Sequence, residues 1–248
     1  MSDLVTVLLA AGMFVAAFGY ASVGHGGASA YLAALALAGV VPAEMRPMAL
    51  LLNLLVSALG TYKFYRAGYF RWRLFWPFAV VSIPLAFIGG AITLPGHAYK
   101  ILVGVVLVYA AWQLWHSARV GDEMRTVREP PLAWALVIGA LLGFLSGLTG
   151  VGGGIFLSPV LLMLGWAGTK QTSAVAAPFI LVNSIAGLAG GFTVQAATLP
   201  SQVWILALAV LAGGWLGAEY GSRRFTNPFI RRLLAVVLAT AGAKMVFV

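Results

Sequence analysis

Two glycine-rich stretches carry the residues best suited to chemistry: GLTGVGGGIFL at 147–157 and a weaker echo, GYASVGHGGAS, at 19–29. Each interrupts the chain between two hydrophobic segments. Glycine has no side chain to block an approaching ion, so several backbone N–H groups can converge on one point. A helix that begins directly afterwards turns its positive end toward the same point. The pattern therefore predicts two anion-binding nests, one in each half of the chain.

The candidate substrate-binding residues lie in or beside these breaks: Ser22, Gly24, His25, Gly26, Gly27, Thr149, Val151, Gly152, Gly153 and Gly154. Backbone N–H groups would hold the anion, and the hydroxyls could add donors. Two alternatives stay open: the glycines could serve close helix packing, and each hydroxyl could bond back to its own helix. A phosphate-binding P-loop is excluded, because its Gly-Lys-Ser/Thr ending does not follow the glycines.

His25 is the only ionisable side chain expected deep in the hydrophobic part of the chain. Intramembrane ionisable groups are usually functional, and a histidine can titrate near neutral pH. His25 could donate to an oxyanion or carry a coupled proton. It could equally be a neutral histidine bonded to a nearby carbonyl.

Two asparagines complete the candidate substrate-binding set. Asn53 and Asn183 are expected inside long helices, where an unpaired amide is costly. They could contact substrate, or they could hydrogen-bond the backbone of the glycine breaks, and the structural role is favoured. Arg46 and Lys170 could guide anions inward from opposite sides.

The composition shows which kind of element must position these residues. Of 248 residues, 62% are hydrophobic and 8% are charged, whereas a soluble domain carries roughly 25% charged residues. The chain is therefore expected to be an integral membrane protein surrounded by the lipid bilayer. Its formal net charge of +9 comes from Lys and Arg in short loops between apolar segments, which predicts membrane topology and no nucleic-acid partner.

Several chemistries have no basis in the residues present. The chain has no cysteine, so disulfides and thiolate sites are excluded. The sequence has no metal-ligand cluster and no Ser-His-Asp order, and no carboxylate is expected near the membrane midplane. We expect no cofactor, no metal and no enzyme activity.

The predicted fold is an all-α polytopic membrane protein with ten apolar segments. The segments are 4–20, 28–41, 45–65, 74–93, 100–115, 132–150, 155–165, 173–194, 201–220 and 229–248. Most approach the roughly 20 residues that a membrane span needs, but 28–41 and 155–165 do not. These two short segments follow the glycine breaks. Whether they cross the membrane or are re-entrant stays open.

The two halves resemble each other. Shifting the chain by 128 residues places Gly24 on Gly152 and His25 on Gly153, and a two-residue adjustment places Asn53 on Asn183. We therefore expect a first membrane repeat at 1–115, a cytoplasmic connecting loop at 116–131 and a second repeat at 132–248.

The basic loops swap between the halves, which predicts inversion of the second repeat relative to the first. Lys63, Arg66, Arg71 and Arg73 follow the third segment of the first half, whereas its counterpart 195–200 has no charge. If basic loops are cytoplasmic, the N-terminus and the C-terminus both lie outside.

These motifs resemble the sulfite exporter TauE/SafE family of membrane permeases. The resemblance rests on GFLSGLTGVGGGIFLSPVLLMLGW at 143–166, KQTSAVAAPFILVNSIAGLAGG at 170–191 and the first-half version at 19–59. It implies transport of sulfite or a small organosulfur anion such as a sulfonate across the bacterial inner (cytoplasmic) membrane.

The expected function is a secondary transporter of a small anion, an exporter by the family's implied direction, that works by alternating access. The alternatives are an anion channel and a non-transporting membrane subunit. A homodimer could form through small-residue faces such as Gly213, Gly214 and Gly217, although these could equally pack within one chain.

Overall fold

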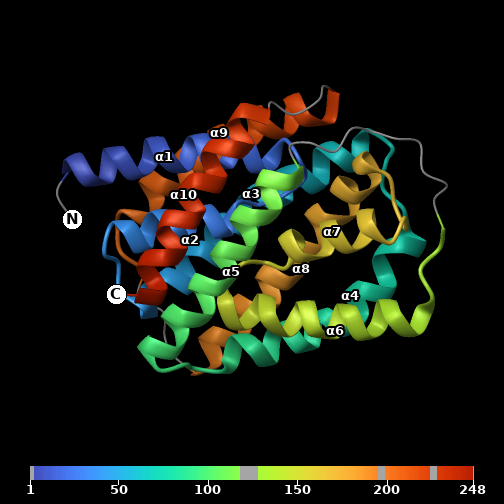
Figure 1. Ribbon diagram of the computed structural model, residues 1–248, viewed down its shortest axis with the longest axis horizontal. Helices are drawn as coiled ribbons and strands as arrows, with labels where there is room; N and C mark the ends of the chain where they lie inside the picture. The colour runs from blue at the N-terminus through green and yellow to red at the C-terminus, as the bar shows by residue number, and fades with distance from the viewer. Residues whose placement is uncertain (1–2, 118–127, 195–198, 224–227, 248) are drawn as a thin grey trace.

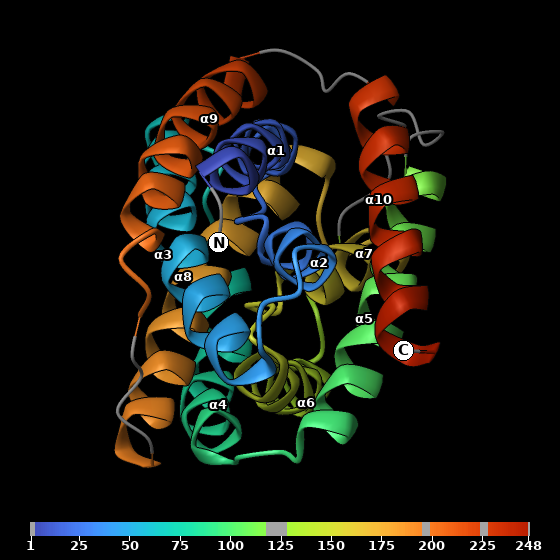
Figure 2. The same ribbon diagram turned by 90° about the vertical axis from the view of Figure 1, so that its left-hand side faces the viewer.

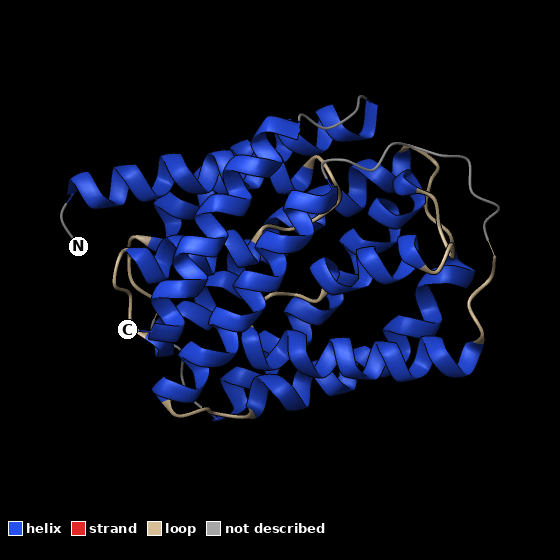
Figure 3. Ribbon diagram, in the orientation of Figure 1, coloured by secondary structure: helices blue, strands red, loops and turns tan. Residues whose placement is uncertain are grey.

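The computed structural model describes the whole chain except residues 1–2, 118–127, 195–198, 224–227 and 248, and the described residues form ten helices without a strand (Figures 1 and 3). In chain order the helices are α1 (Asp3–Ala21), α2 (Ala28–Leu37), α3 (Pro42–Arg66), α4 (Trp72–Ala91), α5 (Gly96–Ser117), α6 (Leu132–Thr149), α7 (Gly154–Met163), α8 (Thr169–Val194), α9 (Val203–Arg223) and α10 (Pro228–Phe247). Helix α5 continues into the first residues of the expected loop at 116–131.

Helix length separates two classes of element. Six helices in the described part of the chain, α1, α3, α4, α6, α8 and α9, are long and apolar enough to span a membrane. Helices α2 and α7 have 10 residues each, so each is about 15 Å long, half the thickness of the hydrocarbon core. The all-α membrane fold is confirmed, and the two short elements lie where the sequence predicts them.

Glycines allow two pairs of long helices to approach closely. Three glycines spaced four residues apart on α9 lie against the backbone of α1 and the residue that follows it, and three glycines with the same spacing on α6 lie against the backbone of α4. The facing pairs are Gly213–Phe14, Gly217–Phe18, Gly221–Ser22, Gly139–Phe78, Gly143–Ser82 and Gly147–Ala86. A Cβ at any of these glycines would collide with the neighbouring backbone, so both contacts depend on the missing side chain. The glycines of α9 thus pack within the chain, and a homodimer stays a prediction.

In Figure 2, α3 and α8 lie on one side of the bundle and α5 and α10 on the other. Helix α3 packs on α8 and α9, α8 packs on α4, and α5 packs on α10 (Figure 2). Helix α1 begins and α10 ends at the same end of the bundle (Figure 1). The short helices α2 and α7 lie inside the bundle, and Tyr31, Leu32 and Leu157 on them are fully buried. The packing therefore places both glycine-rich breaks in the interior.

Candidate anion-binding site at the glycine-rich breaks

A left-handed glycine starts each short helix. Gly27 immediately precedes α2 with φ 98°, and Gly153 immediately precedes α7 with φ 79°. L-residues with side chains rarely adopt this conformation, so glycine is required at both turns. Aligning the short helices at their starts pairs Gly27 with Gly153. It also pairs His25 with Val151, instead of with Gly153 as the sequence alignment predicts.

The side chain of Asn53 connects both breaks. Its Oδ1 accepts a hydrogen bond of 3.2 Å from the N–H of Ala28, the first residue of α2. Its Nδ2 donates to Ser184 Oγ at 3.0 Å and, at 3.5 Å, to the carbonyl oxygen of Val151 in the second break. Asn53 is fully buried. The structure therefore gives it the structural role that the sequence favours.

Asn183 does not repeat this arrangement. Its Nδ2 donates to the carbonyl of Phe179 in its own helix at 2.8 Å, and its buried Oδ1 has no partner among the described residues. The residue that meets Asn53 is its neighbour Ser184. The sequence does not single out Ser184 as a partner of Asn53, because a serine within an apolar helix usually bonds back to that helix.

His25 brings the first break into contact with the second short helix. Its Nδ1 lies 3.2 Å from the carbonyl oxygen of Val23, and its Nε2 lies 3.0 Å from Ser158 Oγ on α7. Ser173 on α8 donates to the same Val23 carbonyl at 2.8 Å. His25 is only partly buried. The imidazole therefore lies at a contact between the two halves, next to a carbonyl as one alternative predicts.

The two flanking hydroxyls bond to their own helices. Ser22 Oγ donates to the Gly19 carbonyl at 2.7 Å, and Thr149 Oγ1 donates to the Leu145 carbonyl at 2.7 Å. Thr149 Oγ1 also accepts from the N–H of Val151 at 3.4 Å. Both hydroxyls thus stabilise the helix ends beside the breaks.

The glycines of the breaks lie against protein on one side. A Cβ at Gly26 or Gly152 would overlap the Asn53 amide, and one at Gly153 would lie 2.9 Å from the Phe179 ring. A Cβ at Gly24 or Gly154 would meet Ser173 or Ile180. Close packing, the alternative use of these glycines, is therefore present at this site.

The backbone of the second break also keeps free donors. Within the described ranges, the N–H groups of Gly152, Gly153 and Gly154 donate to no protein acceptor. Buried N–H groups without acceptors are rare in proteins. Together with the positive end of α7, they can bind an oxyanion.

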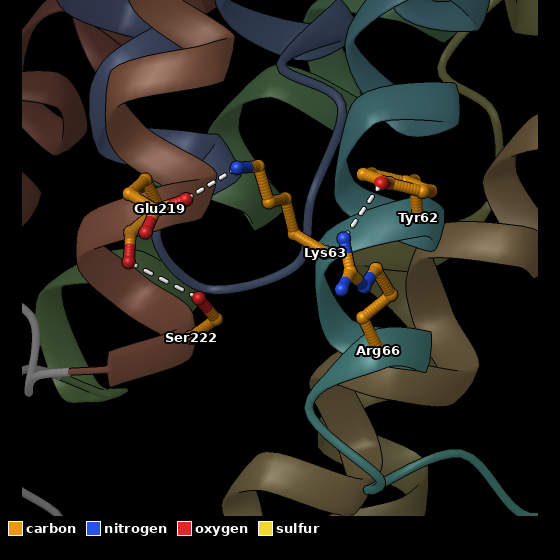
Figure 4. A network of polar contacts seen from close by, with 5 residues as sticks. All are labelled: Tyr62, Lys63, Arg66, Glu219 and Ser222. Carbon is orange, nitrogen blue, oxygen red and sulfur yellow. Dashed lines mark hydrogen bonds and ion pairs between the residues drawn. The ribbon is translucent and has the colours of Figure 1, made fainter.

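A partly buried ion pair links the halves away from the breaks. Lys63 on α3 pairs with Glu219 on α9 (Figure 4). Its Nζ also lies 3.9 Å from the centre of the Trp215 ring. Sequence spacing also predicts a pair between Glu219 and Arg223, one helical turn apart; the side chain of Arg223 lies outside the described residues, so this pair stays a prediction. The pairing of residues 156 positions apart leaves no local signal in the sequence.

Ten helices around two interior backbone breaks define a multi-pass membrane transport protein. The family model for the sulfite exporter TauE/SafE matches residues 8–245 of this chain. The chain belongs to this family, and it is a membrane transporter and not an enzyme.

Relatives from bacteria and an archaeon carry matching names. The chain is 42% identical to the "Probable membrane transporter protein y4hK" of Sinorhizobium fredii, over 99% of this chain and 100% of the relative. It is 30% identical to the "Probable membrane transporter protein ORF9" of Sinorhizobium sp, over 90% and 85% of the two chains. It is 23% identical to the "Probable membrane transporter protein MJ0441" of Methanocaldococcus jannaschii, over 76% and 73%. No solved structure matches the chain.

Proposed function

We propose that the protein is a secondary carrier of a small anion, either sulfite or a small organosulfur anion such as a sulfonate. One observation carries the proposal: two half-length helices begin at left-handed glycines, and the breaks before them are joined by Asn53. Unpaired N–H groups beside Gly153 supply the donors, and the family name supplies the substrate class. The bound anion lies between the two breaks.

Alternating access follows from an inverted repeat in the proposed mechanism. In such a repeat, α1 to α5 correspond in order to α6 to α10. A contact between α1 and α9 in one half-to-half arrangement then requires the equivalent contact between α6 and α4. The α3–α8 and α5–α10 contacts each join a helix to its own counterpart. All four contacts are present, which supports the repeat. Rocking of one glycine-packed pair against the other would expose the breaks first to one side and then to the other.

Transport in liposomes tests the proposal. Reconstituted protein is expected to exchange sulfite or methanesulfonate with saturable kinetics, and these anions are expected to raise its melting temperature. A conductive, non-saturating flux would assign the protein to the channels. No flux and no stabilisation with either anion would overturn the substrate assignment.

The proposed orientation in the bacterial inner membrane has both termini outside and the basic loop after α3 inside. Because the chain has no cysteine, single-cysteine variants report topology without background labelling. A43C, in the first turn of α3, is expected to react with an impermeant maleimide in intact spheroplasts. A67C, just after α3, is expected to react only after lysis. The reverse pattern would invert the proposed topology.

A further inference from the structure

A cavity of about 400 Å³ lies at the end of the bundle where α3 begins. Its wall combines the first turns of α3, the link between α4 and α5, and the last turns of α8. None of the ten candidate substrate-binding residues in or beside the glycine-rich breaks lines this cavity. The cavity is therefore separate from the site between the breaks.

Arg46 supplies a fixed positive charge in the cavity wall. Its Nη1 donates to the Ile92 carbonyl at 2.8 Å, and its Nη2 donates to the Gly90 carbonyl at 2.7 Å. These carbonyls lie at the end of α4, so the backbone holds the guanidinium in place, and no carboxylate of the described ranges pairs with it. A guanidinium has five N–H donors, and those not used by the two carbonyls can bind an anionic group.

The cavity wall also touches the second break. A Cβ at Gly150 would lie 3.0 Å from Arg46 Cγ, so the side-chain stem of Arg46 packs on the residue that opens the break. Tyr99, also in the cavity wall, donates from its hydroxyl to the Thr149 carbonyl at 3.1 Å. The side chains of Arg46 and Tyr99 thus contact both the cavity and the residues that open the second break.

The rest of the wall indicates what kind of anion fits. Leu50, Leu94, Leu188 and Phe192 present apolar surface beside Arg46. Pockets of 300–1,000 Å³ with an apolar lining and a few polar groups typically bind organic molecules. A bare sulfite ion would leave most of this volume and its apolar wall unused.

We propose that the cavity is an entry site for organic anions that carry an apolar group. Arg46 holds the anionic head, and the apolar wall holds the remainder. The transfer of the anion onward to Gly152 and Gly153 rests on the proposed function, whereas binding in the cavity does not. Glu44 also lines the cavity, and its negative charge opposes the ligand.

Equilibrium binding to purified protein in nanodiscs tests the entry site, with benzenesulfonate and methanesulfonate as probes. Benzenesulfonate is expected to bind about tenfold more tightly or better, because its ring buries apolar surface. R46Q is expected to lose most of this binding and R46K to retain part of it. E44Q is expected to bind as well as the wild type or more tightly. Equal affinities for the two sulfonates, or weakening by E44Q as large as that by R46Q, would overturn the proposal.

L188W gives a test that leaves the hydrogen bonds of Arg46 to α4 unchanged. The larger side chain fills the cavity, and benzenesulfonate binding is expected to fall about tenfold or more. Unchanged binding in L188W, alongside anion flux in liposomes, would reject the entry site and keep the proposed function. Benzenesulfonate binding that L188W abolishes, in a protein without any anion flux, would keep the binding site and reject the carrier.

Discussion

The side-chain amide of Asn53 on α3 donates a 3.0 Å hydrogen bond to the hydroxyl of Ser184 on α8, 131 residues further along the chain. The same amide accepts from the first N–H of α2 and donates toward the second break. One fully buried side chain therefore contacts both breaks.

Replacing Asn53 by leucine is expected to destabilise the protein by about 2–4 kcal/mol, because the Ala28 N–H and the Ser184 hydroxyl lose a buried partner. N183L is the matched control. Asn183 bonds only to its own helix and leaves Oδ1 unpaired within the described residues, so its loss is expected to cost about 1 kcal/mol or less. Thermal unfolding in detergent measures both, and equal losses would contradict the bridging role.

Alanine substitutions at Gly153 and Gly39 distinguish the cost of backbone strain from the cost of overpacking. Both have positive φ, 79° and 76°, but a Cβ at Gly39 meets nothing within 4 Å, whereas one at Gly153 lies 2.9 Å from the Phe179 ring. G39A is expected to cost about 1–2 kcal/mol of strain alone. G153A is expected to cost about 1–3 kcal/mol more from overpacking and to abolish anion flux. A G39A variant as impaired in flux as G153A would show that strain alone explains the loss.

The Lys63–Glu219 pair is expected to contribute about 1–2 kcal/mol of coupling free energy in a double-mutant cycle with K63M and E219Q. The side chain of Lys63 is 16% exposed and that of Glu219 is 31% exposed, so solvent screens the pair only in part. The Arg73–Glu129 pair, 89% and 81% exposed, is the control and is expected to couple by about 0–0.5 kcal/mol. Similar coupling in the two cycles would argue against a tie between α3 and α9.

A variant of His25 tests whether this residue carries a coupled proton, one of the roles that the sequence leaves open. In H25Q the titrating ring is lost, so accumulation of sulfite driven by a pH gradient is expected to disappear while anion exchange persists at a lowered rate. S158A keeps the imidazole and removes only the hydroxyl next to Nε2. It is expected to retain gradient-driven accumulation. If H25Q still accumulates sulfite in response to the gradient, the coupled proton is not carried by His25.

The sequence was sufficient to predict the helices and the two short elements. Hydrophobic length alone separates α2 and α7 from the six long candidate spans, and glycine before each short helix marks where the chain must turn. The offset between the halves was wrong by two residues at His25, because the number of residues in a glycine loop is not constrained by helical periodicity. The helix starts at Gly27 and Gly153 give the structural alignment.

Partners between distant residues could not be predicted. Ser158 next to His25, Ser184 next to Asn53 and Lys63 next to Glu219 all join residues on different helices. Which faces of two helices meet depends on their packing angle and their register, and neither quantity is encoded in local spacing. The cavity around Arg46 could not be predicted for the same reason, because its wall comes from three separate segments of the chain.

The glycine contacts between α1 and α9 have a consequence for biosynthesis. Helix α1 is synthesised long before its packing partner α9, because seven helices lie between them in the chain. The α4–α6 pair can form much earlier, because only α5 and the following loop separate its members. Assembly is therefore expected to proceed from the middle of the chain outward, and a nascent chain stalled before α9 would leave the surface of α1 that contacts the α9 glycines open to lipid or to insertion chaperones.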